Sequence, residues 1–420
     1  MNLLETRNSR RALFALLYLA EGAPIGYLWW AFPARLNDAG LDAKQIALVT
    51  ASLTLVWAFK WLWAPLVDAT RHTRWGLRGW IISAQALMGL TLLPLAFTPV
   101  SESTLPFLWG CLLLHAFCAA TQDVSIDALA IRSTPPADRA HVNAWMQIGL
   151  LAGRAIFGGG ALYLERHFSS TTVVLALILS IWLIASVVLL LVHNPSFEKP
   201  TLPPHHRARA FLSIVKEVAR RPSTWWALLL AAVGGAAYEA PAGLATKTLL
   251  DHNVPRETIG PFLAITAILC MSLGALAGGW FADRVNRARA SRILLFLLAL
   301  QTTLLALTLS GSGGGGGADS PGVGQRAMLV LAGIYLLLGA YNASTYALLM
   351  DIADERLAAT QFSACMAATN LCESWSIALA GTLIVSQGYP VAFFAVAVLS
   401  LVAWPAIRPT EPRLSTNRDS

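Results

Sequence analysis

Two apolar stretches of the sequence each carry a glutamate that is followed within five residues by a proline and a glycine. The first reads EGAPIG from Glu21, and the second reads EAPAG from Glu239. A carboxylate in such a setting can hold a polar solute or exchange a proton, and placing it inside a bilayer costs roughly 2.5–3.5 kcal/mol. The proline removes a backbone donor and loosens the helix around the acid. The repeat therefore predicts two similar halves that each present a carboxylate to a shared site.

Further charged side chains lie within apolar stretches, namely Lys60, Asp123, Asp127, Arg154 and Glu373. Asp123 and Asp127 are four residues apart, so they share one face of a helix. Two neighbouring carboxylates can hold a proton between them. We expect Asp123, together with Glu21 and Glu239, to exchange protons. For Asp127 we favour a latch in which it pairs with a basic residue, Arg71, Arg78 or Lys60.

Arg154 is an arginine deep inside an apolar stretch. Its guanidinium fork can clamp a carboxylate or a phosphate with two parallel hydrogen bonds, which predicts an anchor for an anionic solute. A permanent ion pair with Glu21 or Asp123 is the alternative. The other polar and aromatic side chains that could line the same site are Asn143, Gln147, Tyr238, Asn370, Glu373 and Trp375.

The composition requires that these residues lie in a membrane protein. The 420 residues are 56% hydrophobic and 13% charged, whereas soluble domains have about 25% charged residues. The formal net charge of +7 is explained by basic residues in short loops, as membrane topology requires, so it does not indicate nucleic-acid binding. The five cysteines all fall inside apolar stretches without metal-ligand spacing, and we expect them to be small core residues.

Apolar stretches long enough to cross a bilayer indicate the fold, an all-α membrane protein with twelve transmembrane helices in two pseudo-symmetric six-helix bundles. The expected spans are 11–33, 44–66, 78–98, 105–131, 140–164, 171–193, 223–248, 258–281, 290–310, 326–350, 360–384 and 389–407. We expect one bundle at 1–193, a linker at 194–222, and a second bundle with a tail at 223–420. Most of the basic residues then lie on the side of the linker and both termini, which predicts that this side is cytoplasmic.

The loop at 278–287 reads GGWFADRVNR. It resembles the signature loop of the major facilitator superfamily, in which an acid and arginines form a cytoplasmic latch between helices. The corresponding loop of the first half keeps the acid, Asp68, but not the arginine directly after it. The residues that this resemblance and the charge pattern together suggest for gating are Lys60, Asp68, Arg78, Asp127, Asp283, Arg284, Arg287 and Asp351.

Three segments of the first half point to one branch of that superfamily. They are FKWLWAPLVD at 59–68, Gln122 and Asp123 followed by Asp127, and the Gly-x-Pro segment at Gly22. They resemble AmpG-type permeases, which import anhydro-muropeptides across the inner membrane of Gram-negative bacteria with the proton gradient. The resemblance implies a proton-coupled importer of a polar solute such as anhydro-muropeptide in a bacterial inner membrane.

Other functions remain open at this stage. A siderophore importer would use the same fold, and a multidrug exporter would need a less polar site. A membrane enzyme or sensor is a further class, but the sequence offers no nucleophile elbow, metal cluster or phosphate loop. The expected partners are a small-molecule substrate, protons and the lipid bilayer. We expect a monomer that uses no cofactor, no metal and no nucleic acid.

Overall fold

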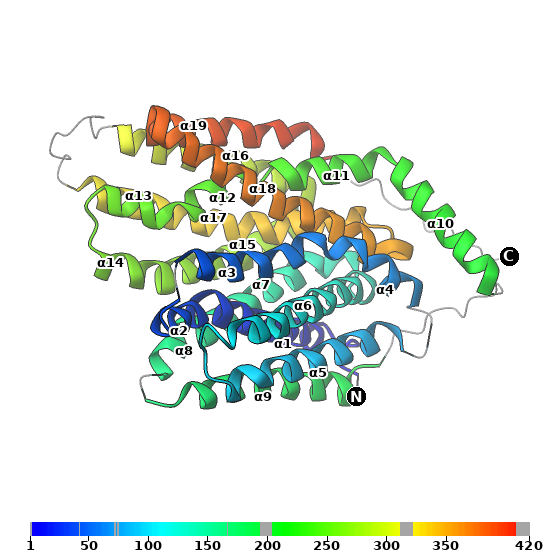
Figure 1. The fold of residues 1–420 in the computed structure, drawn as a ribbon. Coiled ribbons are helices and arrows are strands. Elements are labelled where there is room, and N and C mark those ends of the chain that lie inside the picture. The colour runs from blue at the N-terminus through cyan, green and yellow to red at the C-terminus, as the bar shows by residue number, and fades with distance from the viewer. Residues whose placement is uncertain are drawn as a thin grey trace.

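The computed structural model describes residues 2–41, 43–70, 73, 75–165, 167–193, 204–310 and 322–408, and these are helices and their connections without any strand. Figure 1 shows the helices running side by side along one direction. In the first half they are α1 (Arg7–Gly26), α2 (Phe32–Asp38), α3 (Ala43–Phe59), α4 (Ala64–Thr70), α5 (Gly76–Phe97), α6 (Leu105–Ser133), α7 (Arg139–Arg154), α8 (Gly160–Leu164) and α9 (Ser170–Leu191).

The second half follows the linker. Its helices are α10 (Pro204–Arg220), α11 (Pro222–Val233), α12 (Ala236–Gly243), α13 (Ala245–Asp251), α14 (Arg256–Pro261), α15 (Ile268–Val285), α16 (Arg287–Ser310), α17 (Val323–Ile352), α18 (Ala358–Gln387) and α19 (Tyr389–Ser400). Short π-helical segments at Tyr27–Ala31, Ala155–Gly159 and Phe262–Ala267, and 3₁₀ turns at Lys60–Leu62, Pro136–Asp138, Glu355–Leu357 and Leu401–Ala406, connect or extend these helices.

Eight helices of the described chain are long and apolar enough to cross a membrane, and a ninth crossing results if the bent pair Pro222–Gly243 and Ala245–Asp251 counts as one span. The two parts of that pair meet at 46°, just after Pro241. The expected spans 44–66, 140–164 and 360–384 are helical as well, although their helices do not meet the same combined requirement of length, hydropathy and few charges. Two of these three helices, α7 and α18, carry the polar residues considered for the site.

Glycines let α1 and α7 approach each other closely. A Cβ atom at Gly22 would lie 2.1 Å from the carbonyl oxygen of Leu150, and one at Gly149 would lie 2.0 Å from that of Ala15. Small residues at helix contacts are the usual basis of tight packing inside membranes. The space beside Gly22 is therefore filled by the backbone of α7.

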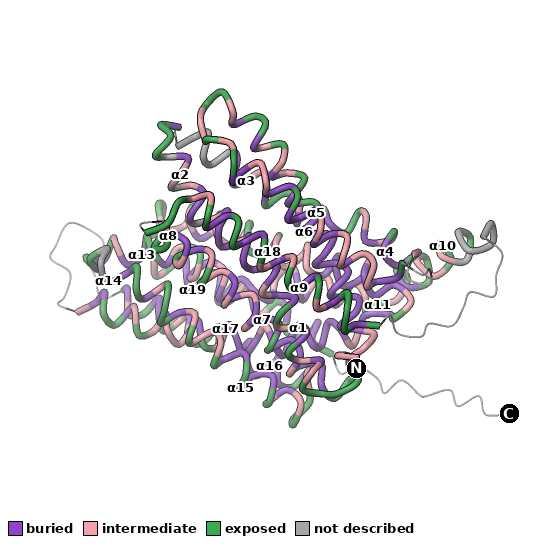
Figure 2. Tube along the Cα trace, turned by 90° about the horizontal axis from the view of Figure 1, so that it is seen from below, coloured by how far each residue is buried: buried purple, intermediate pink, exposed green. Residues whose placement is uncertain are grey.

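The two halves meet along a few helices. From the first half, α7 packs against α15 and α17, and α6 packs against α18. Figure 2 shows buried residues concentrated along the helices in the middle of the molecule. We call the end of the molecule that carries α4, α10 and the starts of α7 and α18 the linker end. The hydrogen bonds and ion pairs that join the two halves gather there.

Candidate functional site

An ion pair between Lys60 and Asp123 lies inside the first half. Lys60 begins the 3₁₀ turn after α3 and Asp123 is in the middle of α6, and their side chains are 4% and 6% exposed. A buried charge is strongly unfavourable without a partner of opposite sign, so each of these residues stabilises the other. Lys60 was expected to serve as a gate residue, but in this conformation it neutralises Asp123.

Asp127 has a different partner from the one expected. Its Oδ1 accepts a hydrogen bond of 2.6 Å from the hydroxyl of Tyr18 on α1, and its Oδ2 is buried without a partner. Arg78, one of the basic residues considered for it, donates instead to the carbonyl oxygens of Val188 and Leu189. Another, Arg71, lies outside the described residues. In this conformation Asp127 therefore forms a hydrogen bond between α6 and α1, and the expected latch with a basic residue stays a prediction.

Glu21 and Arg154 lie near each other on α1 and α7, since the backbones of Gly22 and Gly26 contact those of Leu150 and Arg154. Glu21 is 5% exposed, and its Oε2 has no hydrogen-bond partner. The Nε of Arg154 is likewise buried and unpaired, and within the described part of the chain no ion pair involves Arg154. The permanent pair considered from the sequence is thus not formed in this conformation.

The second half places two more carboxylates within electrostatic range of Arg154. They are Glu239 on α12 and Glu373 on α18, and Glu239 and Glu373 also act on each other. Glu373 is exposed and Glu239 is partly buried. Arg154, a residue of the first half, therefore lies within electrostatic range of acidic groups from both halves.

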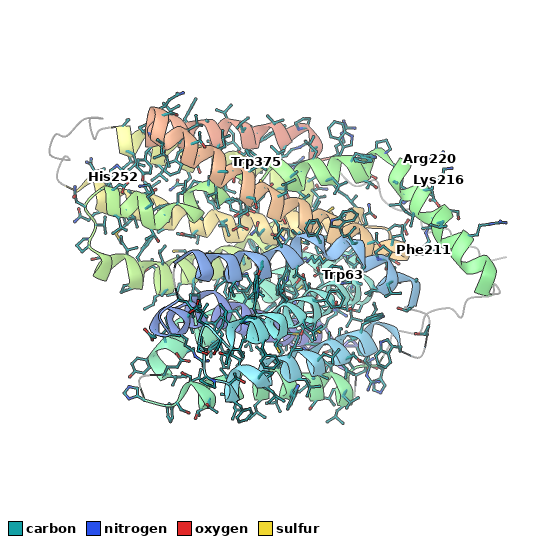
Figure 3. The ribbon with its side chains drawn as sticks, in the orientation of Figure 1. Trp63, Phe211, Lys216, Arg220, His252 and Trp375 are labelled. Atoms are coloured by element: carbon teal, nitrogen blue, oxygen red, sulfur yellow. The ribbon has the colours of Figure 1, made fainter. Side chains whose placement is uncertain are left out.

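The polar and aromatic candidates fall into two groups. Tyr238 donates a hydrogen bond of 3.0 Å to Oδ1 of Asn342, and Trp375 on α18 donates one of 2.8 Å to the carbonyl oxygen of Ala232 (Figure 3). These two hydrogen bonds therefore connect helices of the second half, and each donor lies close in sequence to Glu239 or Glu373. Gln147 and Asn370 are partly buried on α7 and α18.

Asn143 lies at the linker end rather than beside Arg154. Its side-chain nitrogen donates 2.9 Å to the carbonyl oxygen of Arg139 and lies 3.1 Å from the sulfur of Met350. Because Met350 belongs to the other half, Asn143 contributes to the contact between the halves. Its expected place in the solute site stays a prediction.

At the linker end, Asp68 joins α4 to the start of α18. It accepts hydrogen bonds from the backbone N–H of Ala359 at 3.2 Å, from the backbone N–H of Thr360 at 2.8 Å and from the hydroxyl of Thr360 at 2.8 Å. Arg132 on α6 lies 3.3 Å from the same carboxylate. The first N–H groups of a helix have no partner within the helix and carry partial positive charge. Asp68 therefore caps a helix of the opposite half.

A second set of contacts lies around Asp283 at the end of α15. Asp283 pairs with His141 of the first half and, at 3.1 Å, with Arg287. Asp351 at the end of α17 pairs with Arg287 and, at 2.8 Å, with Arg139 of the first half. Asp283 and Asp351 of the second half thus bind basic residues from both halves. These ion pairs hold the two halves together at the linker end.

Arg284 does not take part in this network. Its guanidinium lies 4.1 Å from the ring centroid of Trp280, and its side chain is exposed. In this conformation Arg284, for which a gating role was expected, makes a cation–π contact within α15 and does not join the two halves.

The end of the linker helix α10 is attached to the second half by another group of charges. Arg221 lies 2.9 Å from Asp354, and Arg356 lies 2.9 Å from Asp354 and 3.0 Å from Glu217 on α10. The hydrogen bonds from Arg356 lower the pKa of Asp354 to about 2, against the opposing effect of its partial burial. Figure 3 shows Phe211, Lys216 and Arg220 along α10, which extends beyond the end of the bundle.

One group of possible metal ligands exists within the described residues. Asp138, His141 and Asp283 offer ligand atoms within 4.8 Å of one another. However, Asp138 accepts a hydrogen bond of 2.9 Å from Arg7 and another from Arg11, and Asp283 pairs with Arg287. Basic side chains therefore already neutralise these carboxylates, and we assign the group to the contacts of the linker end.

Sequence reasoning did not identify Tyr18, Arg139, His141 and Thr360. A short sequence repeat was present at the linker end. The first half reads ADR from Ala137 to Arg139, and the second half reads ADER from Ala353 to Arg356. In each half the aspartate precedes a helix and binds arginines. A repeat of acid and arginine at the start of corresponding helices could have indicated both contacts.

The fold and the buried charges at the meeting of two helical halves define a membrane carrier. A model of the Major Facilitator Superfamily matches residues 14–379, and the chain belongs to this family of transporters. It is 25% identical over 360 residues to the anhydromuropeptide permease of Escherichia coli strain K12, a match covering 84% of this chain and 70% of that protein.

Solved structures share the fold. The E. coli fucose:proton symporter FucP superposes with a TM-score of 0.71 at 13% identity, covering 95% of this chain and 97% of that one. A bacterial homologue of the iron transporter ferroportin, in an outward-facing state, superposes with a TM-score of 0.69 at 14% identity, covering 95% and 98%. At such identities the likeness shows the fold alone.

Proposed function

We propose that the chain is a proton-coupled importer of a polar solute, such as an anhydro-muropeptide, in the inner membrane of a bacterium. The observation that carries the proposal is Arg154, which forms no ion pair with any described residue and lies within electrostatic range of Glu21 of its own half and of Glu239 and Glu373 of the other. Such an arginine can bind an anionic group of a solute from the first half while the second half contributes further contacts. The sequence similarity to the anhydromuropeptide permease supports this substrate class.

The topology belongs to the same proposal. Twelve crossings result if three further segments cross the membrane in addition to the apolar helices, namely α3, the continuous segment from α7 to α8, and α18. The chain then has two six-helix bundles, 1–193 and 223–420, which are joined by the linker at 194–222. The excess of lysine and arginine on the linker side favours a cytoplasmic position for the linker and both termini. The closed linker end then makes this conformation one in which the solute site is open to the outside.

Proton coupling is supported by the charges of the interior. Five carboxylates, those of Glu21, Asp123, Asp127, Glu239 and Glu373, lie within the expected membrane spans together with two basic side chains, Lys60 and Arg154. Such an excess of acids needs protons or a cationic ligand for neutralisation. We assign proton exchange to Asp123, Glu21 and Glu239. Protonation of Asp123 would release Lys60 and change the packing between α3 and α6, which would shift the balance between the open and closed forms.

The test is uptake of labelled anhydro-muropeptide by proteoliposomes with an imposed proton gradient, with empty liposomes as the control. We expect accumulation that a protonophore abolishes. Arg154→Gln should abolish uptake, whereas Asp123→Asn should keep exchange down a solute gradient but lose accumulation. Folded protein that takes up no muropeptide would overturn the substrate class, and gradient-driven uptake by Asp123→Asn would overturn the coupling residue.

A further inference from the structure

We propose that the corner between the linker helix α10 and α11 binds the headgroups of anionic phospholipids, and that Lys216, Arg220 and Arg408 hold their phosphate groups. The occupant is the membrane leaflet on the linker side. The site is built from exposed residues rather than from the buried charges of the interior, and the inference holds whichever solute the protein carries.

The first step is the position of this corner relative to the bilayer. Figure 1 shows α10 leaving the bundle at an angle where α11 begins, and α11 opens the apolar span that starts at Pro222. Arg220 lies two positions before Pro222 and Lys216 six positions before it, so a rise of about 1.5 Å per residue keeps both within about 10 Å of the start of the span. The headgroup layer on each side of the hydrocarbon core is about 5–8 Å deep. Both long side chains can therefore reach it.

The second step is that side-chain hydrogen bonds fix the corner. The indole Nε1 of Trp225 donates 2.8 Å to the carbonyl oxygen of Ala219, and the hydroxyl of Thr224 donates 2.8 Å to that of Val218. Trp225 is nevertheless 63% exposed, and an exposed tryptophan at the end of a span is typical of the interface between membrane and water. The last turn of α10, which includes Arg220, is thus held at this depth.

The third step is the charge of α10. Lys216 and Arg220 are four positions apart and share one face of the helix with Arg209, which lies seven positions before Lys216. All three are exposed. Among the described residues no carboxylate pairs with Lys216 or Arg220, whereas the neighbouring Glu217 already pairs with two other arginines. Phosphate oxygens are suitable partners for such cations, and each basic residue near an anionic membrane surface strengthens binding.

Apolar side chains occupy the opposite side of α10. Val218 is buried, and Phe211, Ile214 and Val215 are half-buried. A helix with one apolar side and one side rich in basic residues is typical of segments that lie in the membrane interface. A soluble acidic partner would match the charge as well, but it would explain neither the depth of the corner nor the exposed Trp225.

A third cation lies beside the start of α11. The guanidinium of Arg408 lies 4.3 Å from the ring centroid of Trp226, and Arg408 is exposed. Its place is set by the preceding residue, Ile407, whose carbonyl oxygen accepts a hydrogen bond from Arg292 on α16. Cations from two segments that are distant in the sequence therefore flank the start of α11.

The experiment measures hydrogen exchange of α10 in the full chain, reconstituted in nanodiscs of phosphatidylcholine with and without phosphatidylglycerol. We expect exchange at residues 211–220 to be at least about fivefold slower with phosphatidylglycerol, since one basic residue near an anionic surface contributes a factor of about this size. A double variant with Lys216→Gln and Arg220→Gln should bring this ratio close to one. Arg408→Gln should lower the ratio in part, and an unchanged ratio would remove Arg408 from the site.

The matched control is Arg326→Gln. It removes the same charge from an exposed residue near the start of α17, opposite the linker end, and should keep the native ratio. Equal exchange of α10 in both lipids would overturn the inference and leave these cations to a soluble acidic partner. Slower exchange that persists in the double variant would overturn it too, because Lys216 and Arg220 would then not hold the headgroups.

Inorganic phosphate added to the phosphatidylcholine nanodiscs separates a lipid headgroup from a soluble phosphate. We expect no protection of α10 by phosphate alone, and protection equal to that by phosphatidylglycerol would overturn the membrane as the occupant. No solute is present in these measurements, so their outcome does not depend on the proposed transport function.

Discussion

Asp68 of α4 accepts two hydrogen bonds of 2.8 Å from Thr360, one from its backbone N–H and one from its hydroxyl, although the two residues are in different halves of the chain. The cap of a 30-residue helix in the second half is therefore supplied by the first half. The start of α18 would lose this cap if the linker end opened, which would tie the stability of one helix to the conformation of the whole molecule.

Replacement of that carboxylate should favour the open linker end. Asp68→Asn keeps one acceptor oxygen but removes the charge that faces the helix N-terminus and Arg132, and we expect a shift of about 1–3 kcal/mol towards the open form. Distances between spin labels placed on the two halves at the linker end would report it. Arg284→Gln is the matched control, because Arg284 lies nearby without joining the halves. Unchanged distances in Asp68→Asn would contradict the capping role.

The pair of Lys60 and Asp123 should behave as one unit in folding. Lys60→Met or Asp123→Leu alone leaves a buried charge without its partner and should destabilise the protein by about 3–5 kcal/mol. The double variant should recover most of that loss, because neither charge remains. Thermal unfolding in detergent of the four proteins would give the coupling energy. A double variant as unstable as the sum of the two single ones would show that the pair does not interact as the structure indicates.

The contact between α1 and α7 should not tolerate a single added methyl group. Gly22→Ala would place a Cβ atom about 2.1 Å from the carbonyl oxygen of Leu150, and we expect a loss of about 1–3 kcal/mol in stability. Gly110→Ala in α6 is the control, since no atom lies within 4 Å of its added Cβ, and it should be neutral or slightly stabilising. Equal melting temperatures of the two variants would argue against the close approach of these helices.

Acid should detach the linker helix from the second half. Because the pKa of Asp354 is lowered to about 2 in the folded protein, its ion pairs stabilise the attachment fully above the ordinary carboxylate value of about 4. This stabilisation is lost as the pH falls from about 4 to 2. Asp354→Asn should remove it already at neutral pH.

Hydrogen exchange of α10 measures that attachment directly. At pH 7 the exchange should be faster in Asp354→Asn than in the native protein, and Glu102→Gln should exchange like the native protein. Equal protection of α10 in all three proteins would mean that other contacts hold the linker helix.

Hydropathy and local motifs identified much of the fold and part of the linker-end contacts. The helical spans and the family follow from patterns within 20 to 30 residues, such as the apolar stretches and the loop around Asp283. Arg287 begins α16 after the break in the helix at Asn286 and still reaches Asp283, whereas Arg284, one position after Asp283 on α15, points about 100° away.

The pairings inside the membrane could not be predicted, because they depend on how distant helices rotate against one another. Asp123 and Asp127 share a face, yet one pairs with Lys60 and the other bonds to Tyr18. Several acids and bases were available, and the sequence sets no preference among their combinations. The partner of Asp283, His141, is 142 residues away in the chain, and no local pattern links the two.

The surplus of carboxylates in the interior has a consequence for the response to voltage. Five acids and two basic groups leave a formal excess of three negative charges. In the proposed transport cycle these groups remain on the protein while access to them changes from one side of the membrane to the other, and the cations that neutralise them enter from one side and leave to the other. Moving each unit charge across the full membrane potential changes the free energy by about 2.3 kcal/mol per 100 mV. The rate and direction of the cycle are therefore expected to depend on membrane potential as well as on concentration.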